Sequence, residues 1–290
     1  MRGDPLVCAF LCSYAYDTER RPPGAFDPRC GYSWLWPGVY GGMSDWKRFT
    51  CGDSDAQALF CFRESDRTVF VAFRGTDSLR DAVLDLAVAK RRVAFLADTH
   101  PGARVHHGFL KQHRSCVAAV REYIQRHEGR ARVVVTGHSL GASVAVVTAA
   151  LLVDELREPG VGCVVFGCPR VGNADFARRV DELLSVRRVT VGRDPVCSVP
   201  SRARWRHVGE RVWYLNGACA RRAGACDPWY NMLVPPNLFC VDDHRMAGYV
   251  DAVAADELRG GSCVTPWWRL GHAGIYMAAL AATAFLLATT

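Results

Sequence analysis

A serine between two glycines is the first group in the chain that could do chemistry. Ser139 lies in Gly137-His138-Ser139-Leu140-Gly141, which fits the pattern G-x-S-x-G. A β-branched run at 133–136 precedes this pentapeptide, and small and apolar residues at 142–150 follow it. A strand, a tight turn and a helix in this order are typical of a nucleophile elbow, which exposes the serine oxygen. A plain Gly/Ser loop is the alternative, and the flanking pattern favours the elbow.

A serine nucleophile needs a base, and the base needs an acid that orients it. Asp194 follows a strand-like run and precedes Pro195, so we expect it on a loop at the carboxyl end of a strand, where active-site groups of open α/β sheets gather. His207 and His244 compete for the role of base, and the position of His244 near the end of the domain favours it. Other acids after the serine fit less well: Asp175, Asp181 and Asp227.

Strand-like and helical segments alternate along the chain, which predicts an α/β fold class. The turn at 64–67 joins two strand-like runs and predicts an antiparallel hairpin, so we expect a mixed sheet. The predicted strands are 55–62, 68–73, 133–136, 162–167, 188–192 and 211–215. The predicted helices are 115–127, 176–184 and one that follows residue 244.

Composition restricts the possible functions. The 290 residues are 50% hydrophobic and 22% charged, which indicates one large globular domain rather than a disordered chain. The net charge of +7 comes from scattered arginines without interleaved aromatics, so nucleic acid is not an expected partner. The positive charge is then interpreted either as a solvated basic surface or as a surface that is attracted to an anionic membrane. Thirteen cysteines without a C-x-x-C pair predict no zinc site, although Cys219 and Cys226 could form a disulfide.

The two ends of the sequence are apolar. Residues 6–16 predict a helix packed on the domain, with a weak signal peptide as the alternative. Residues 273–290 carry no charge and would span roughly 27 Å as a helix, so we expect a C-terminal membrane anchor. A helix packed on the domain or a cleaved lipid-anchor signal are the alternatives. The expected division is an N-terminal region 1–54, a catalytic domain 55–262 and a hydrophobic segment 263–290.

An ordered set of motifs resembles the class 3, or fungal-type, lipases. The motifs cover roughly residues 55–250: Phe73-Arg74-Gly75-Thr76, His107-Gly108-Phe109, the Ser139 pentapeptide, Pro169-Arg170-Val171-Gly172-Asn173, Asp194-Pro195-Val196 and Asp243-His244. The resemblance implies an α/β-hydrolase fold with a central, mostly parallel sheet flanked by helices. It also implies a triad of Ser139, Asp194 and His244, and an oxyanion hole from the backbone N–H groups of Thr76 and Leu140. No metal or cofactor is implied.

Lipases of this family carry a lid just after the oxyanion residue. Residues 79–95 match that position and have helical apolar spacing, with three basic residues near the end. The candidate lid residues are Leu79, Val83, Leu86, Lys90, Arg91 and Arg92. An ordinary surface helix with a basic end is the alternative.

The resemblance predicts a serine carboxylic-ester hydrolase that cleaves acyl esters of glycerolipids. Phospholipase A1 is the alternative within the enzyme class, and a catalytically silent hydrolase fold that binds membranes is the alternative outside it. The expected partners are a lipid ester and a membrane or lipid–water interface, with no obligate protein partner. We expect membrane association through the C-terminal segment, with a secreted or a soluble cytoplasmic protein as alternatives. The segment from Asn216 to Pro236 matches no part of the family pattern.

Overall fold

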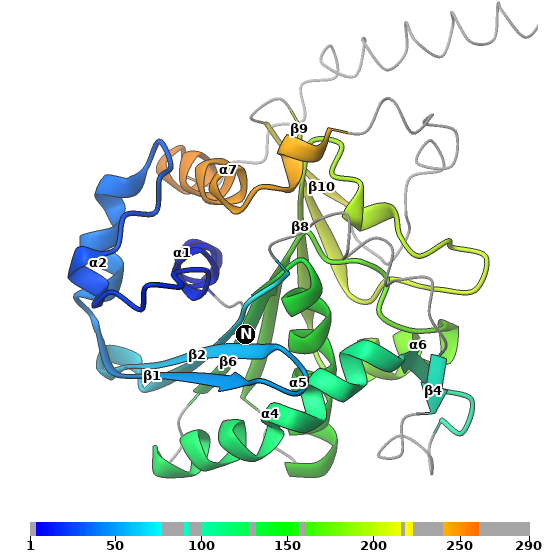
Figure 1. Ribbon diagram of the computed structural model, residues 1–290. Helices are drawn as coiled ribbons and strands as arrows, with labels where there is room; N and C mark the ends of the chain where they lie inside the picture. Colours follow the sequence, from blue (N-terminus) through cyan, green and yellow to red (C-terminus); the bar gives the residue numbers. More distant parts are fainter. Residues whose placement is uncertain are drawn as a thin grey trace, which may run out of the picture.

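An eight-stranded sheet forms the centre of the computed structural model, which describes residues 4–76, 90–92, 100–127, 132–156, 160–215, 218–222 and 240–260 (Figure 1). The strand order is β1-β2-β3-β6-β7-β8-β9-β10. The strands from β3 to β9 pair in parallel, whereas β1, β2 and β10 pair antiparallel with their neighbours. Their bounds are Met43–Cys51 (β1), Ala56–Arg63 (β2), Thr68–Phe73 (β3), Arg132–His138 (β6), Val161–Phe166 (β7), Val186–Val191 (β8), Glu210–Leu215 (β9) and Ala218–Arg222 (β10).

Helices cover both faces of this sheet (Figure 1). One face packs against α4, α5 and α6, and the opposite face packs against α1 and α7, with α2 beside α1. The helix bounds are Pro5–Ala15 (α1), Trp36–Tyr40 (α2), His107–Arg126 (α4), Leu140–Leu156 (α5), Ala174–Leu183 (α6) and Met246–Leu258 (α7). The predicted α/β class, with a mostly parallel sheet flanked by helices, is confirmed.

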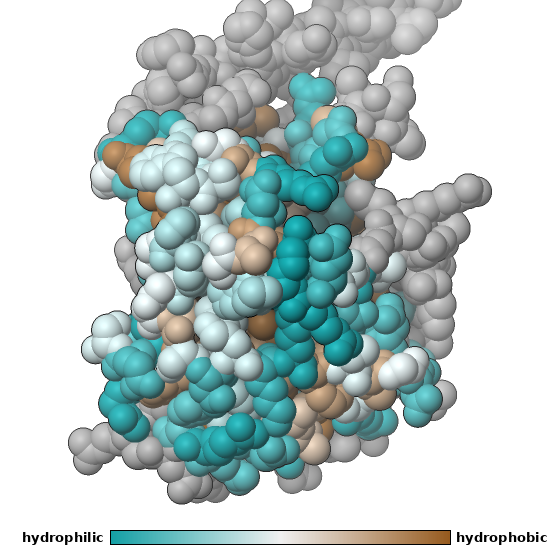
Figure 2. Space-filling model, turned by 60° about the vertical axis from the view of Figure 1, so that its left-hand side comes forward, coloured by the Kyte–Doolittle hydropathy of each residue, from teal (hydrophilic) through white to brown (hydrophobic). Residues whose placement is uncertain are grey.

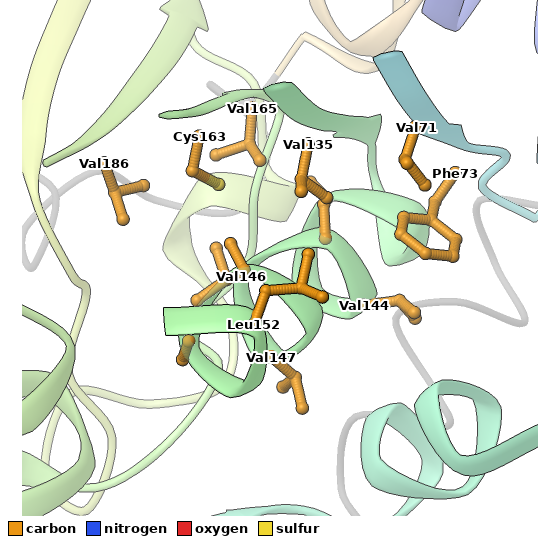
Figure 3. Close-up of a cluster of buried hydrophobic side chains, with 14 of the residues drawn as sticks. Val71, Phe73, Val135, Val144, Val146, Val147, Leu152, Cys163, Val165 and Val186 are labelled. Carbon is orange, nitrogen blue, oxygen red and sulfur yellow. The ribbon is translucent and has the colours of Figure 1, made fainter. Parts of the chain in front are cut away.

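The residues of the central strands explain why both faces are covered. Side chains alternate between the faces of a strand, so Val133 and Val135 enter the core under α4–α6 while Val134 enters the core under α1 and α7. A strand buried on both faces must be apolar throughout, as the valine run of β6 is. Figure 3 shows Val146 and Leu152 of α5 facing the sheet in the first of these cores.

The N-terminal helix belongs to the core. Asp4 caps α1 by accepting a hydrogen bond from the backbone N–H of Val7 at 3.1 Å, and the middle of the helix, 8–12, is completely buried. α1 lies beside α7 on the sheet (Figure 1). In the structure, α1 thus forms part of the core on this face of the sheet. Strand β1 was not predicted, and it adds an antiparallel edge to the sheet.

The segment predicted as a lid helix contains a strand. Lys90–Arg92 form β4, which pairs antiparallel with β5, Arg104–His106, in a separate two-stranded sheet. The helix predicted over 79–95 is therefore wrong at these three residues, because their backbone groups bond to β5 instead of to a helical turn. Candidate lid residues Leu79, Val83 and Leu86 lie outside the described residues.

Several other predictions also lie outside the described part, including the anchor at 273–290 and the partner Cys226 of the suggested disulfide. Within the described ranges, no helix has the length and hydropathy needed to cross a membrane. The surface in Figure 2 is mainly hydrophilic, with hydrophobic residues in small, scattered groups. Single exposed hydrophobic residues of this kind are normal for a folded protein.

Candidate active site

Ser139 occupies a strained turn between β6 and α5. Its φ of +59° lies in the left-handed region, where residues other than glycine are uncommon. The residues two positions before and after it must be glycines. A Cβ on Gly137 would lie 2.3 Å from the carbonyl oxygen of Gly141, and a Cβ on Gly141 would lie 2.4 Å from that of Phe73. The predicted elbow is present, and its strain holds the serine hydroxyl at the carboxyl end of the sheet.

A chain of hydrogen bonds joins the three predicted triad residues. The Oγ of Ser139 lies 2.8 Å from Nε2 of His244, and Nδ1 of His244 lies 2.7 Å from Oδ2 of Asp194. All three residues are buried. The geometry allows Ser139 to donate its proton to the imidazole while the carboxylate orients the ring from the other side.

Asp194 is fixed by its own loop and by helix α7. It follows β8, and its Oδ1 accepts a hydrogen bond from the backbone N–H of Val196 at 2.8 Å. The hydroxyl of Tyr249 donates to Oδ2 at 2.5 Å. Burial, and then the nearby carboxylate charge, raise the pKa of Tyr249 well above its ordinary value, so the phenol stays a hydrogen-bond donor. These two hydrogen bonds hold the Asp194 carboxylate in place beside the imidazole.

His244 lies on a short 3₁₀ helix, Val241–His244, that is held in place by His138 of the elbow. Nε2 of His138 donates to the backbone oxygen of His244 at 2.9 Å, because a carbonyl can only accept. Burial, and then the neighbouring His244, lower the pKa of His138 well below its ordinary value, so the ring is neutral. Its Nδ1 must then accept, and the hydroxyl of Tyr16 donates to it at 2.7 Å.

A second contact connects the loops that carry His244 and Asp194. The carboxylate of Asp243 accepts a hydrogen bond from the backbone N–H of Arg193 at 2.7 Å. Gly192 makes room for it, since a Cβ there would lie 2.2 Å from the Asp243 carboxylate. Arg193 and Asp243 directly precede the predicted acid, Asp194, and the predicted base, His244, so this contact sets the separation of the two loops locally.

The two predicted oxyanion residues flank the serine. Gly75, which precedes Thr76, approaches so closely that a Cβ on it would lie 2.9 Å from Cβ of Ser139 and 2.3 Å from the Tyr16 hydroxyl. Leu140 is the first residue of α5, and the first N–H groups of a helix have no acceptor within it. Backbone N–H groups at these places are suited to stabilise a developing oxyanion.

The rival candidates from the sequence have other contacts. Nε2 of His207 donates to the carbonyl oxygen of Cys197 at 2.9 Å, and Asp181 accepts from the backbone N–H of Gly209 at 2.6 Å. Asp175 pairs with Arg178 on α6. Asp227 and the candidate lid residues before Lys90 lie outside the described ranges. Within those ranges, His, Cys, Asp and Glu side chains form no cluster of three or more that could hold a metal.

Sequence reasoning did not find the roles of Tyr16 and Tyr249. Tyr16 lies 122 residues before His138, and no local pattern in the sequence connects them. Tyr249 follows the predicted base by five residues, which a helix starting just after His244 could have suggested. Tyr16 directly follows α1 and Tyr249 lies on α7, and these two helices cover one face of the sheet.

Comparison with known proteins gives related sequences and structures. The family described as Lipase (class 3) matches residues 70–203. A lipase from Rhizopus niveus is 32% identical over 182 residues, which cover 58% of this chain and 44% of that protein. A secreted mono- and diacylglycerol lipase from Malassezia globosa is 29% identical over 68% of this chain and 69% of its own length. The solved structure of lipase II from Rhizopus niveus superposes with a TM-score of 0.71 at 25% identity, covering 83% of this chain and 91% of that one.

The chain spans less than half the length of the curated Rhizopus lipase that it matches. The family match contains the elbow, the oxyanion segment and Asp194, and the structural likeness extends over most of the described fold. This protein therefore belongs to the class 3 lipase family.

Proposed function

We propose that the protein is a serine carboxylic-ester hydrolase that cleaves acyl esters of glycerolipids through Ser139, His244 and Asp194. The observation that supports this proposal is the continuous hydrogen-bonded chain from Ser139 Oγ through the imidazole to the Asp194 carboxylate. The strained φ of Ser139 also supports it, because strain of this kind persists where the surrounding structure holds it for a purpose.

The mechanism has two halves. In the first, Nε2 of His244 takes the proton of Ser139 as Oγ attacks the acyl carbonyl, and the N–H groups of Thr76 and Leu140 hold the oxyanion. His244 then gives the proton to the leaving alcohol, which leaves an acyl-enzyme. In the second half, His244 takes a proton from water as the water oxygen attacks the acyl group, and it returns this proton to Ser139 Oγ as the fatty acid departs. Asp194 stabilises the imidazolium in both halves.

Neutral glycerolipids are the substrates that we propose, with phospholipase A1 activity as the alternative. The Malassezia relative is described as a mono- and diacylglycerol lipase, which supports partial glycerides as the first substrates to test. We also propose that residues around Leu79, Val83 and Leu86 form a lid at the lipid–water interface. The lid, if helical, must end before β4, since Lys90–Arg92 pair with β5.

We also propose that residues 263–290 attach the protein to a membrane, after a catalytic domain that ends near residue 262. The absence of charge from 273 to 290 supports this attachment. A secreted or a soluble cytoplasmic protein is the alternative, and the Malassezia relative is described as secreted. Separation of cell lysate into membrane and soluble fractions, for the full chain and for a chain in which Leu286 and Leu287 are replaced by arginine, tests it.

The decisive experiment assays the full chain on a diacylglycerol emulsion, on a triacylglycerol emulsion and on phosphatidylcholine vesicles, beside Ser139→Ala. Loss of the nucleophile should lower kcat on the order of 10⁶-fold. Thermal unfolding of both proteins controls for folding. Covalent labelling by a fluorophosphonate probe, which reacts only with an activated serine, is measured in parallel.

The possible results separate the proposals. Fatty-acid release that disappears in Ser139→Ala supports the mechanism, and the substrate that is hydrolysed fastest gives the lipid class. Labelling of Ser139 without hydrolysis of any of the three lipids supports a hydrolase for a different ester. A folded protein that neither labels nor hydrolyses would refute the enzyme and favour the silent membrane-binding protein.

A further inference from the structure

A cavity of about 170 Å³ lies beside the candidate active site without including its triad. It opens to solvent where β1 ends and β2 begins. We name it the arginine cavity, and its lining residues are Ala15, Asp17, Thr18, Arg20, Arg48, Phe49, Thr50, Gln57, Ala58 and Arg74. Its volume is large enough for several water molecules, and therefore for a small tetrahedral anion.

Three guanidinium groups line this cavity, and two of them are held in place. Arg48 stacks 4.3 Å from the ring centre of Tyr14 and donates to the Tyr14 carbonyl oxygen at 3.1 Å. Arg74 donates to Oε1 of Gln57 at 2.9 Å. Because both arginines are oriented by the fold, a ligand that binds them does not have to order them.

Positive charge exceeds negative charge in the arginine cavity. Its acidic lining residue, Asp17, accepts three hydrogen bonds from Arg21, at 2.7, 2.8 and 3.0 Å, and lies 3.9 Å from Arg48. Arg20 bonds only weakly to Oγ1 of Thr50, at 3.5 Å, and no carboxylate of the described residues lies within 4.0 Å of it. The lining thus holds three guanidinium groups and one carboxylate, which already pairs with Arg21, and this excess of positive charge attracts anions.

We infer that the arginine cavity binds a phosphate group. A guanidinium presents parallel N–H donors that match the spacing of phosphate oxygens, and Thr18 and Thr50 add hydroxyl donors at the lining. The phosphate can come from a lipid head group or from a soluble phosphate. Arg74 directly precedes Gly75 and Thr76, so the bound phosphate lies beside the predicted oxyanion segment. This inference does not require that the protein hydrolyse esters.

Binding is tested with full-length Ser139→Ala protein, so that lipids in the assay are not consumed. Calorimetry measures the affinity for inorganic phosphate, and co-sedimentation measures binding to phosphatidylcholine vesicles with and without phosphatidic acid. Arg20→Gln and Arg48→Gln remove one charge each from the cavity. Arg178→Gln is the matched control, because Arg178 is exposed on α6 and its loss changes the net charge equally. Thermal unfolding checks each variant.

The expected result is phosphate binding that weakens about tenfold in Arg20→Gln and in Arg48→Gln and is unchanged in Arg178→Gln. Phosphatidic acid vesicles that lose binding in the same two variants indicate a lipid head group as the source. Inorganic phosphate binding without vesicle binding indicates a soluble phosphate. The inference is overturned if the protein binds neither inorganic phosphate nor the vesicles, or if Arg178→Gln weakens binding as much as the two cavity variants. Arg20→Gln is decisive if Arg48→Gln does not fold, since Arg20 is exposed.

Discussion

A methyl group added at Gly167 would press directly on the hydrogen bond between the predicted acid and base. A Cβ at this position would lie 2.9 Å from Cε1 of His244 and 3.0 Å from Oδ2 of Asp194. Carbon atoms in contact stay about 3.5 Å apart, so the imidazole must retreat by roughly 0.6 Å, the difference between 3.5 and 2.9 Å. Gly167→Ala therefore separates His244 from Ser139 or from Asp194.

The expected cost has two parts. Misplacing a catalytic group by about 1 Å can lower the rate about 100-fold, so a shift of this size should lower kcat/KM by roughly 10- to 100-fold. The φ of Gly167 is +56°, and alanine in this region costs roughly 1–2 kcal/mol of stability. Only the first part concerns the active site, so activity and stability are measured separately.

Gly260→Ala is the matched control. Gly260 also has a positive φ, +77°, but nothing lies within 4 Å of a Cβ placed on it. Both variants should lose similar stability in urea unfolding, and only Gly167→Ala should lose turnover of a soluble p-nitrophenyl ester. Full kcat/KM in folded Gly167→Ala, or an equal loss in both variants, would refute the placement of Gly167 against the triad.

Two further predictions follow from buried side chains. Tyr249→Phe removes a donor to Asp194 and should lower kcat/KM about tenfold, because hydrogen bonds to charged groups contribute about 1.5–3 kcal/mol. Tyr214→Phe, which removes the 3.1 Å bond to Asp256, is the control, and equal kinetics in the two variants would contradict the prediction. Burial, and then Arg121 and Arg114, lower the pKa of His113 from 6.5 to about 4. The unfolded chain therefore takes up this proton first, and as the pH falls from 6.5 to 4 the free energy of unfolding should drop by up to about 3 kcal/mol. Urea unfolding of wild type and His113→Gln measures this, and an unchanged pH slope in the variant would exclude His113.

The central strands and the elbow could be predicted from the sequence because their signals are local. The valine run of β6, the glycines around Ser139 and the apolar start of α5 act within a few residues of one another. Chain order predicts Asp194 after a strand-like run and His244 near the end of the domain. The structure brings His244 to Ser139 and Asp194 to His244, and their catalytic roles stay a prediction for the assays above.

The contacts that hold the site together were harder to predict because they join distant segments. Tyr16 reaches His138 only after α1 has packed on the sheet, and α1 gave no sign of where it would pack. β1 has a mixed sequence, since an edge strand with exposed side chains lacks the apolar run of a buried one. Lys90–Arg92 follow helical spacing in the sequence, yet pairing with β5 decides their conformation.

The shared cover of α1 and α7 over one sheet face matters for anyone who expresses a shortened protein. The family match runs from 70 to 203, and a fragment cut at those limits would lack both helices and the predicted base. Phe70, Val134 and Phe166 would then face water, and such a fragment should aggregate. A useful expression boundary must keep residues 5–15 and 246–258 together, because each helix completes the surface against which the other packs.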